Sequence, residues 1–393
     1  MSEPRCPPAE NFSLTRGGPF HLLLVRLGQT GDERHRVVQR AVGAAVLTWL
    51  PLLVLTLAQG TAFGARVELT LLRDFSANLR FLVALPILIL AESRIDRRWR
   101  QLVLEFLRCR LVSASDLPAF EAVIERIMRQ RDRVLPEAVL AVIALLPSLF
   151  VARIELLTVS NWHALAGSGG DVSPAGWWFS LVSSPIFRFL LLRWAWRMLL
   201  WTTFLWRVCR LELRLVATHT DMAAGLGFLS EGQRTFSPVV FAGGTVIAGQ
   251  VGNAIAYEGA TLSSVQYHMI AYGVLAIFIL VAPLLAVAPR LINLRKSALL
   301  EYGALVTSHA QLFDDKWIRG NHAPDEVLLG NADASSLADL GGSFSVVRQM
   351  QVVPIDKRTL VSLAVAAALP MLPVVVFATP ANELVGAVIK MLG

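Results

Sequence analysis

The sequence predicts an all-α protein, a polytopic bundle of about seven transmembrane helices with its N-terminus in the cytoplasm. Apolar residues make up 55% of the 393 residues and charged residues only 17%, and the mean hydropathy is +0.56. A soluble chain of this length rarely has such a composition. Seven apolar stretches also approach the roughly 20 residues that a helix needs to cross the hydrocarbon core of a bilayer. Basic residues gather on one side of these stretches, which gives the orientation.

The predicted spans differ in how well they match the thickness of a bilayer. In chain order they are Ala41–Gly60, Phe81–Ile95, Glu137–Leu157, Trp177–Trp206, Phe236–Tyr257, Tyr267–Ala288 and Thr359–Thr379. The second is the shortest and contains Pro86, so a full crossing is in question there. The fourth is longer than a bilayer requires, which predicts that it tilts, breaks at Pro185 or projects into the cytoplasm.

The distribution of Lys and Arg sets the orientation, because basic residues are retained in cytoplasmic loops. With the N-terminus inside, segments 1–40, 92–136, 207–235 and 290–358 hold 6, 10, 4 and 8 basic residues, which is 28 of the 36 in the chain. This pattern predicts a multi-pass protein of a bacterial inner (cytoplasmic) membrane. The basic loops match anionic lipid headgroups, and the sequence shows no nucleic-acid-binding motif. The lipid bilayer is therefore the expected partner, and no nucleic acid is expected.

The same reasoning divides the chain into membrane and cytoplasmic parts. Residues 1–18 are rich in Pro, Gly and polar types and are expected to be disordered. Helical periodicity predicts a cytoplasmic helical hairpin over residues 96–134 and two further helices, Leu294–Ile318 and Ser335–Met350. The predicted parts are a cytoplasmic N-terminal segment 1–40, a six-helix membrane region 41–290, a cytoplasmic helical segment 291–358, and a last span with a short tail, 359–393.

Three arginines, Arg188, Arg193 and Arg197, lie inside the otherwise apolar fourth span. An arginine near the bilayer centre costs about 2.5 to more than 10 kcal/mol, so it usually faces a partner, a cavity or an interface. One interpretation places Arg188 and Arg193 on a positively charged path for a substrate. In the alternative, the side chains extend to the cytoplasmic headgroups beside an aromatic belt that includes Trp194 and Trp201.

The fifth predicted span carries small residues at strict four-residue spacing. Such a ridge lets another helix approach closely, either within the bundle or from a second copy of the chain in a homo-oligomer. Gln250 and Asn253 lie beside the ridge, where they could hydrogen-bond a neighbouring helix or line the path of a polar solute. The residues of the ridge are Gly244, Ala248, Gly252 and Ala256.

A polar motif follows the fourth span. Residues 211–229 read LELRLVATHTDMAAGLGFL, in which Thr218, His219 and Asp221 could bind a cation or a phosphate or exchange a proton. Alternatively, Asp221 caps the next helix while Gly225 and Gly227 allow a tight bend. No metal site is predicted, because no other His or Cys lies close enough in sequence to complete a metal shell.

Residues 211–229 resemble a segment of an uncharacterised family of proteobacterial polytopic inner-membrane proteins. Residues 335–347, SSLADLGGSFSVV, are similar to a second segment of that family. The two segments cover under a tenth of the chain, and the resemblance implies no particular activity.

Enzyme signatures such as a P-loop, a G-x-S-x-G elbow and an H-E-x-x-H helix are absent, and the sequence specifies no cofactor. Three functions therefore stay open, in this order. The first is a channel or transporter for an anion or small polar solute. The second is a membrane scaffold or sensor that acts through its cytoplasmic helices. The third is a membrane-embedded enzyme that uses His219 and Asp221.

Overall fold

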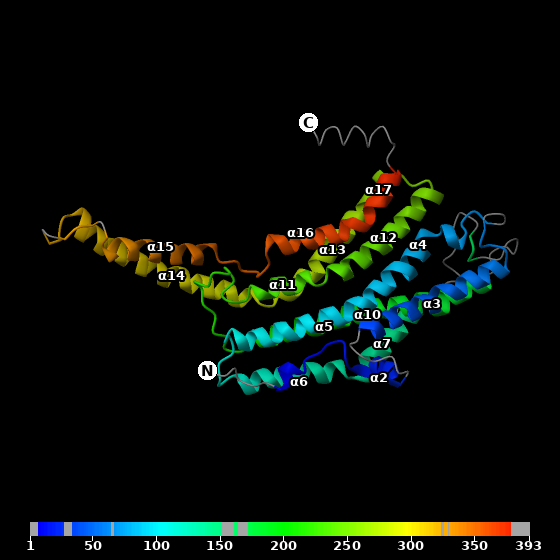
Figure 1. The fold of residues 1–393 in the computed structure, drawn as a ribbon, viewed down its shortest axis with the longest axis horizontal. Coiled ribbons are helices and arrows are strands. Elements are labelled where there is room, and N and C mark those ends of the chain that lie inside the picture. The colour runs from blue at the N-terminus through cyan, green and yellow to red at the C-terminus, as the bar shows by residue number, and fades with distance from the viewer. Residues whose placement is uncertain are drawn as a thin grey trace.

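The computed structural model describes residues 7–26, 34–63, 67–150, 161–163, 172–323, 326–328 and 330–378. All regular elements in these residues are helices, most of them nearly parallel, so that the molecule is elongated (Figure 1). The elements are α1 (Pro7–Glu10), α2 (Gly18–Arg26), α3 (Arg34–Ala58), η1 (Leu71–Arg73), α4 (Phe75–Asn78), η2 (Leu79–Ala84), α5 (Leu85–Arg108), α6 (Leu117–Arg131), α7 (Val134–Leu145), η3 (Leu146–Phe150), α9 (Pro174–Trp178), η4 (Phe179–Ser183), α10 (Ser184–Val208), α11 (Phe228–Arg234), α12 (Ser237–Tyr257), α13 (Leu262–Leu285), α14 (Ala288–Phe313), η5 (Asp314–Ile318), α15 (Ala332–Gln349), α16 (Lys357–Ala368), η6 (Leu369–Met371) and α17 (Leu372–Ala378).

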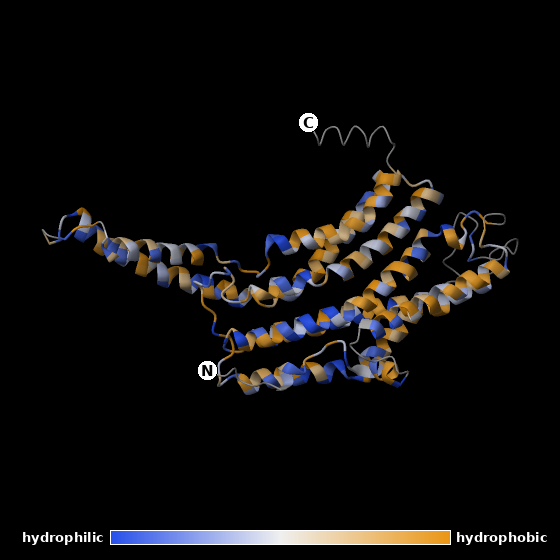
Figure 2. Ribbon diagram, viewed as in Figure 1, coloured by the Kyte–Doolittle hydropathy of each residue, from blue (hydrophilic) through white to orange (hydrophobic). Residues whose placement is uncertain are grey.

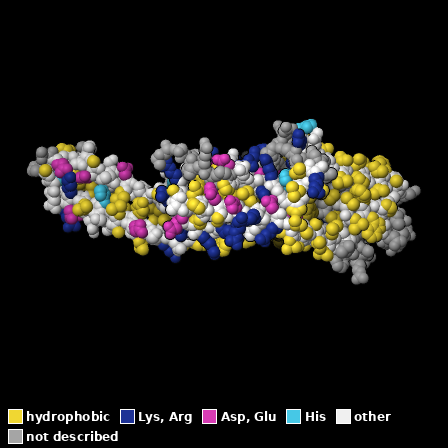
Figure 3. Space-filling view, turned by 90° about the horizontal axis from the view of Figure 1, so that it is seen from below, with side chains coloured by type: hydrophobic (Ala, Val, Ile, Leu, Met, Phe, Trp, Pro, Cys, Tyr) yellow, Lys and Arg dark blue, Asp and Glu magenta, His cyan; other side chains and the backbone are white. Residues whose placement is uncertain are grey.

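Six helical stretches in the described part of the chain are long and apolar enough to cross a membrane, which confirms the predicted helical membrane bundle. They are His35–Ala58, Phe75–Arg108, Pro174–Val208, Phe228–Tyr257, Leu262–Leu285 and Lys357–Ala378. The third predicted span is present as a shorter apolar helix, Val134–Ser148; residues 151–160 lie outside the described residues. Hydrophobic residues gather in the helices at one end of the molecule (Figure 2), and hydrophobic side chains cover its surface there (Figure 3).

The two longest stretches both contain a π-helical segment near their start. In each, a π-helical segment, η2 or η4, ends two residues before a proline, Pro86 or Pro185. Proline lacks an N–H and its ring clashes with the carbonyl four residues earlier, and a wider turn relieves that clash. The helices therefore continue for 34 and 35 residues. At 1.5 Å per residue each is about 50 Å long, well beyond the hydrocarbon core.

The N-terminal segment is folded, so the prediction that residues 1–18 are disordered is wrong for residues 7–18. Asp96 of α5 accepts hydrogen bonds from the Ser13 hydroxyl (2.8 Å) and from the backbone N–H groups of Leu14 (3.0 Å) and Thr15 (3.1 Å). Phe12 is fully buried. Composition alone missed this order because the acceptor lies some 80 residues away in sequence.

The helices predicted within residues 96–134 and 291–358 are present. After α5, the chain turns back as α6, and α14 and α15 form a second hairpin that projects from the end of the molecule opposite its apolar end (Figure 1). In Figure 3 the surface of this part shows charged side chains scattered among other polar and hydrophobic ones. The structure contains no membrane, so the cytoplasmic location of both hairpins stays a prediction.

The small-residue ridge packs inside the chain along most of its length. A Cβ atom added to Gly244 would lie 2.7 Å from the carbonyl oxygen of Ala367 in α16, and one on Gly252 would contact Phe75. Ala248 is also buried, whereas Ala256 is exposed. The ridge thus brings α12 against α16 and α4. A homo-oligomer through these residues stays a prediction.

Candidate functional site

Four buried charged side chains meet where α5, α7 and α10 come together, and we call them the Glu92 cluster. Glu92 Oε1 lies 2.8 Å from Arg197 Nη1 and 3.8 Å from Arg193 Nη1. Glu137 Oε1 lies 3.4 Å from Arg193 Nε. Each of these four residues is more than nine-tenths buried. Mutual neutralisation is what makes four charges tolerable at this depth.

Helical spacing explains which arginines join this cluster. Arg193 and Arg197 are four residues apart and therefore share one face of α10, whereas Arg188 points elsewhere. Arg188 donates a hydrogen bond to the Ala144 carbonyl (2.8 Å) at the end of α7. The structure thus separates Arg188 from Arg193.

The Glu92 cluster borders a cavity of about 360 Å³ between α2, α3, α5 and α10. Its charged lining residues are Arg40, Glu92 and Arg193, so we call it the Arg40 cavity. The Arg193 guanidinium carbon also lies 4.5 Å from the centre of the Phe20 ring, within reach of a cation–π contact. The cavity is accordingly bounded by two cations, one anion and apolar side chains.

Positive charge exceeds negative charge around the Arg40 cavity. Among the described residues, Arg40 has no carboxylate within salt-bridge distance, and its Nε is buried without a hydrogen-bond partner. His21 does not add charge at neutral pH, because burial and the nearby Arg193 and Arg40 lower its pKa. Three arginines therefore face two carboxylates, Glu92 and Glu137, which leaves one positive charge uncompensated.

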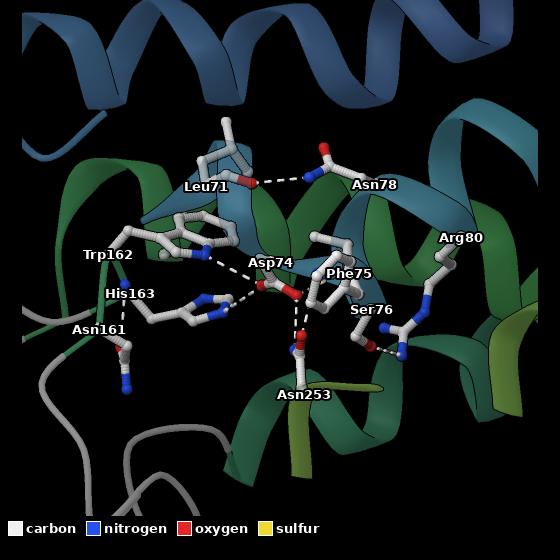
Figure 4. Close-up of polar contacts among 12 residues, drawn as sticks. Leu71, Asp74, Phe75, Ser76, Asn78, Arg80, Asn161, Trp162, His163 and Asn253 are labelled. Atoms are coloured by element: carbon white, nitrogen blue, oxygen red, sulfur yellow. Dashed lines mark hydrogen bonds and ion pairs between the residues drawn. The ribbon is translucent and has the colours of Figure 1, made fainter. Parts of the chain in front are cut away.

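A second buried polar group, the Asp74 cluster, lies at the other end of the α4–α5 stretch (Figure 4). Asp74 accepts hydrogen bonds from Asn253 Nδ2 (2.8 Å), Trp162 Nε1 (3.0 Å) and the Ala77 N–H (2.9 Å). Asn253 Oδ1 accepts from the Phe75 N–H. The amide of Asn253 thus joins α12 to the N-terminus of α4.

His163 completes the Asp74 cluster. Its Nε2 lies 4.0 Å from Asp74 Oδ2, and its ring stacks on Trp162 at 3.8 Å between centroids. Burial lowers the pKa of His163 despite the neighbouring carboxylate, so the imidazole is neutral at pH 7. Gln250, predicted beside Asn253, is exposed on the surface of α12 and lies outside the cluster.

The polar motif after α10 forms a tight turn around Asp221. The Asp221 carboxylate accepts hydrogen bonds from the backbone N–H groups of Ala223, Gly225 and Gly227, at 2.8–3.1 Å. Gly225 has φ of +92°, a conformation that favours glycine. His219 Nδ1 lies 2.8 Å from Asp221 Oδ1. Thr218 is half-buried.

This geometry gives Asp221 a role in closing the turn. Burial alone would raise the pKa of Asp221, but the three N–H donors together hold this pKa below its usual value. In the described part of the chain, no group of three or more His, Cys, Asp and Glu side chains is placed to hold a metal ion. Because its oxygens already accept three backbone hydrogen bonds, the Asp221 carboxylate has little capacity left to bind a substrate.

No family model, curated protein or solved structure matches the chain.

Sequence reasoning assigned no functional role to Glu92, Glu137, Arg40 or Asp74, although Glu92 and Glu137 lie within predicted spans. One signal was available. Glu92 lies inside one predicted span, and Arg193 and Arg197 lie four residues apart inside another. Charges of opposite sign within two apolar stretches predict that the two helices face each other.

Proposed function

We propose that this chain is a transporter or channel for an anion, with the Arg40 cavity as the binding site on the predicted cytoplasmic side. The observation that carries the proposal is the uncompensated positive charge at this cavity. Arg193 already has two carboxylates near it, whereas Arg40 has none within 4 Å among the described residues. An entering anion would therefore pair with Arg40 first. The volume of the cavity falls in the range of small-molecule sites.

A moving transporter fits this conformation better than an open pore. Phe81, Leu85 and Leu88, which lie between Asp74 and Glu92 in the sequence, are fully buried. Asp74 and Glu92 are 18 residues apart, about 27 Å along a helix, so this packed core separates the two polar clusters. A solute bound at the Arg40 cavity would need helices to move before it could reach Asn253.

Anion flux in liposomes tests the proposal. Purified protein would be reconstituted and the efflux of chloride, nitrate, phosphate and short alkyl phosphates measured one at a time. Arg40→Gln should lower the flux of the accepted anion about tenfold, the effect of losing about 1.4 kcal/mol of interaction. The matched control is Arg36→Gln, which removes an exposed charge from the same helix. Absence of flux above protein-free liposomes, or equal loss in both variants, would contradict the proposal.

A second candidate function is a scaffold or sensor, and the α14–α15 hairpin favours it. Leu300, Leu305 and Leu312 of α14 are 77%, 54% and 66% exposed. Apolar side chains on a projecting helix are common at protein interaction surfaces. In liposomes a scaffold or sensor should give no anion flux above protein-free liposomes, whereas a transporter should give a flux that replacing the three leucines with serine leaves unchanged.

A further inference from the structure

The Arg40 cavity has a polar end and an apolar end. Glu92 and Arg40 lie at one end, whereas Leu85 and Leu47, each seven residues away on the same helix, also line it. Seven residues of helix span about 10 Å. Because residues after Glu92 in α5 are increasingly charged, the polar end faces the predicted cytoplasmic headgroups. The apolar end therefore points toward the middle of the bilayer.

Helix α2 places the cavity at the boundary between headgroups and acyl chains. Phe20 and Leu24 of α2 line the cavity, while Leu22 and Leu23 of the same helix are 60% and 51% exposed. A short helix with apolar side chains on its outer face is typical of helices that lie in the membrane interface. Glu137 holds its first turn by accepting a hydrogen bond from the Phe20 N–H at 2.7 Å.

The charge and the lining of the Arg40 cavity together suit an amphipathic anion. One uncompensated arginine suits a group of single negative charge, and a guanidinium matches the geometry of a phosphate, which it can bind through two hydrogen bonds. The apolar side chains of Leu47, Leu85 and Ile89 suit a hydrocarbon chain. Small inorganic anions would leave this apolar end without a function.

We propose that the Arg40 cavity binds an anionic phospholipid of the inner leaflet, with its phosphate at Arg40 and the first part of one acyl chain along α3 and α5. The inference deepens the proposed function by naming the chemical class of the anion. It rests on the assignment of the cavity as the anion site, but lipid binding does not itself require that the lipid be moved.

Lipid binding to the full chain tests this inference. Protein purified in uncharged detergent would be titrated with phosphatidylglycerol, phosphatidylcholine or sodium phosphate, and bound lipid counted by native mass spectrometry. We expect one tightly retained phosphatidylglycerol. Arg40→Gln should weaken its binding at least about tenfold. Gly43→Phe, which fills the cavity from α3 at a position with nothing within 4 Å, should weaken it similarly without removing charge.

The control and the alternative outcomes separate this inference from the proposed function. Gly273→Phe, at a position on α13 that is equally open, should leave binding unchanged, and thermal unfolding would verify that each variant is folded. Equal retention of phosphatidylcholine, or unchanged binding in both cavity variants, would overturn the inference. Phosphate binding as tightly as the lipid would also overturn it while leaving anion transport standing. Lipid binding without any flux would support the inference and contradict transport.

Discussion

Replacing Glu92 by glutamine should destabilise the fold strongly, because it leaves buried arginines without their counter-charge. Glu92 is the carboxylate closest to Arg197, at 2.8 Å, and it also lies 3.8 Å from Arg193. Arg193 would keep Glu137 as its counter-charge, whereas in the described part of the chain Arg197 has no second carboxylate within 4 Å. Breaking a buried ion pair from one side costs about 3–5 kcal/mol.

Unfolding by heat or by denaturant, with the protein in a mild detergent, measures this loss of stability. Glu105→Gln is the matched control on the same helix, because the Glu105–Arg108 pair is at the surface and should contribute less than about 1 kcal/mol. The double variant Glu92→Gln with Arg197→Gln should lose less than the sum of the single variants, since it removes both charges of the pair. If Glu92→Gln costs no more than Glu105→Gln, the Glu92 cluster does not stabilise the bundle as argued.

Three further predictions address other parts of the structure. Asp96→Asn should lower the free energy of unfolding by about 1.5–3 kcal/mol and speed hydrogen exchange in residues 9–16. Unchanged exchange would show that Asp96 does not anchor this segment. Gly244→Ala should destabilise by about 1–3 kcal/mol through overpacking, whereas Gly273→Ala should not, because nothing lies within 4 Å of that position; equal unfolding temperatures would contradict the packing described. The pKa of Asp221 is lowered in the folded protein. The ionised carboxylate therefore stabilises the turn fully above the ordinary pKa of about 3.9, and this stabilisation is lost as the pH falls through the pKa of the folded state. Amide protection in its turn should therefore persist as the pH falls to this ordinary value and disappear only below it, and loss at higher pH would refute this.

The fold class could be predicted because the hydrocarbon core imposes a length and a composition on every span. What the sequence could not supply was where long helices begin. Phe81–Ile95 looked short because the predicted span began only after Arg80, yet the helix starts at Phe75 and accommodates Arg80. Asn253 bonds the Asp74 carboxylate from α12. Such contacts between distant helices decide whether a charge can lie at the end of a span, and they leave no local pattern.

The candidate site was predictable only in part, for a similar reason. Arg193 and Arg197 were identifiable because a charge inside an apolar stretch is expensive. Arg40 lies before its span, among other basic residues, and nothing in its local sequence distinguishes it from Arg36. Its significance depends on α2 folding back beside α3 to enclose the cavity, and α2 is positioned by Glu137 from α7.

An experimental map of the protein in nanodiscs that contain phosphatidylglycerol would test lipid binding in the Arg40 cavity most directly. We expect elongated density in this cavity, with its polar end against the Arg40 guanidinium and its chain passing Leu47 and Leu85, and we expect Arg40→Gln to remove it. A map in which the side chains of α2 and α3 close this space, or in which lipid density is equal in both proteins, would show that the cavity is not a lipid site.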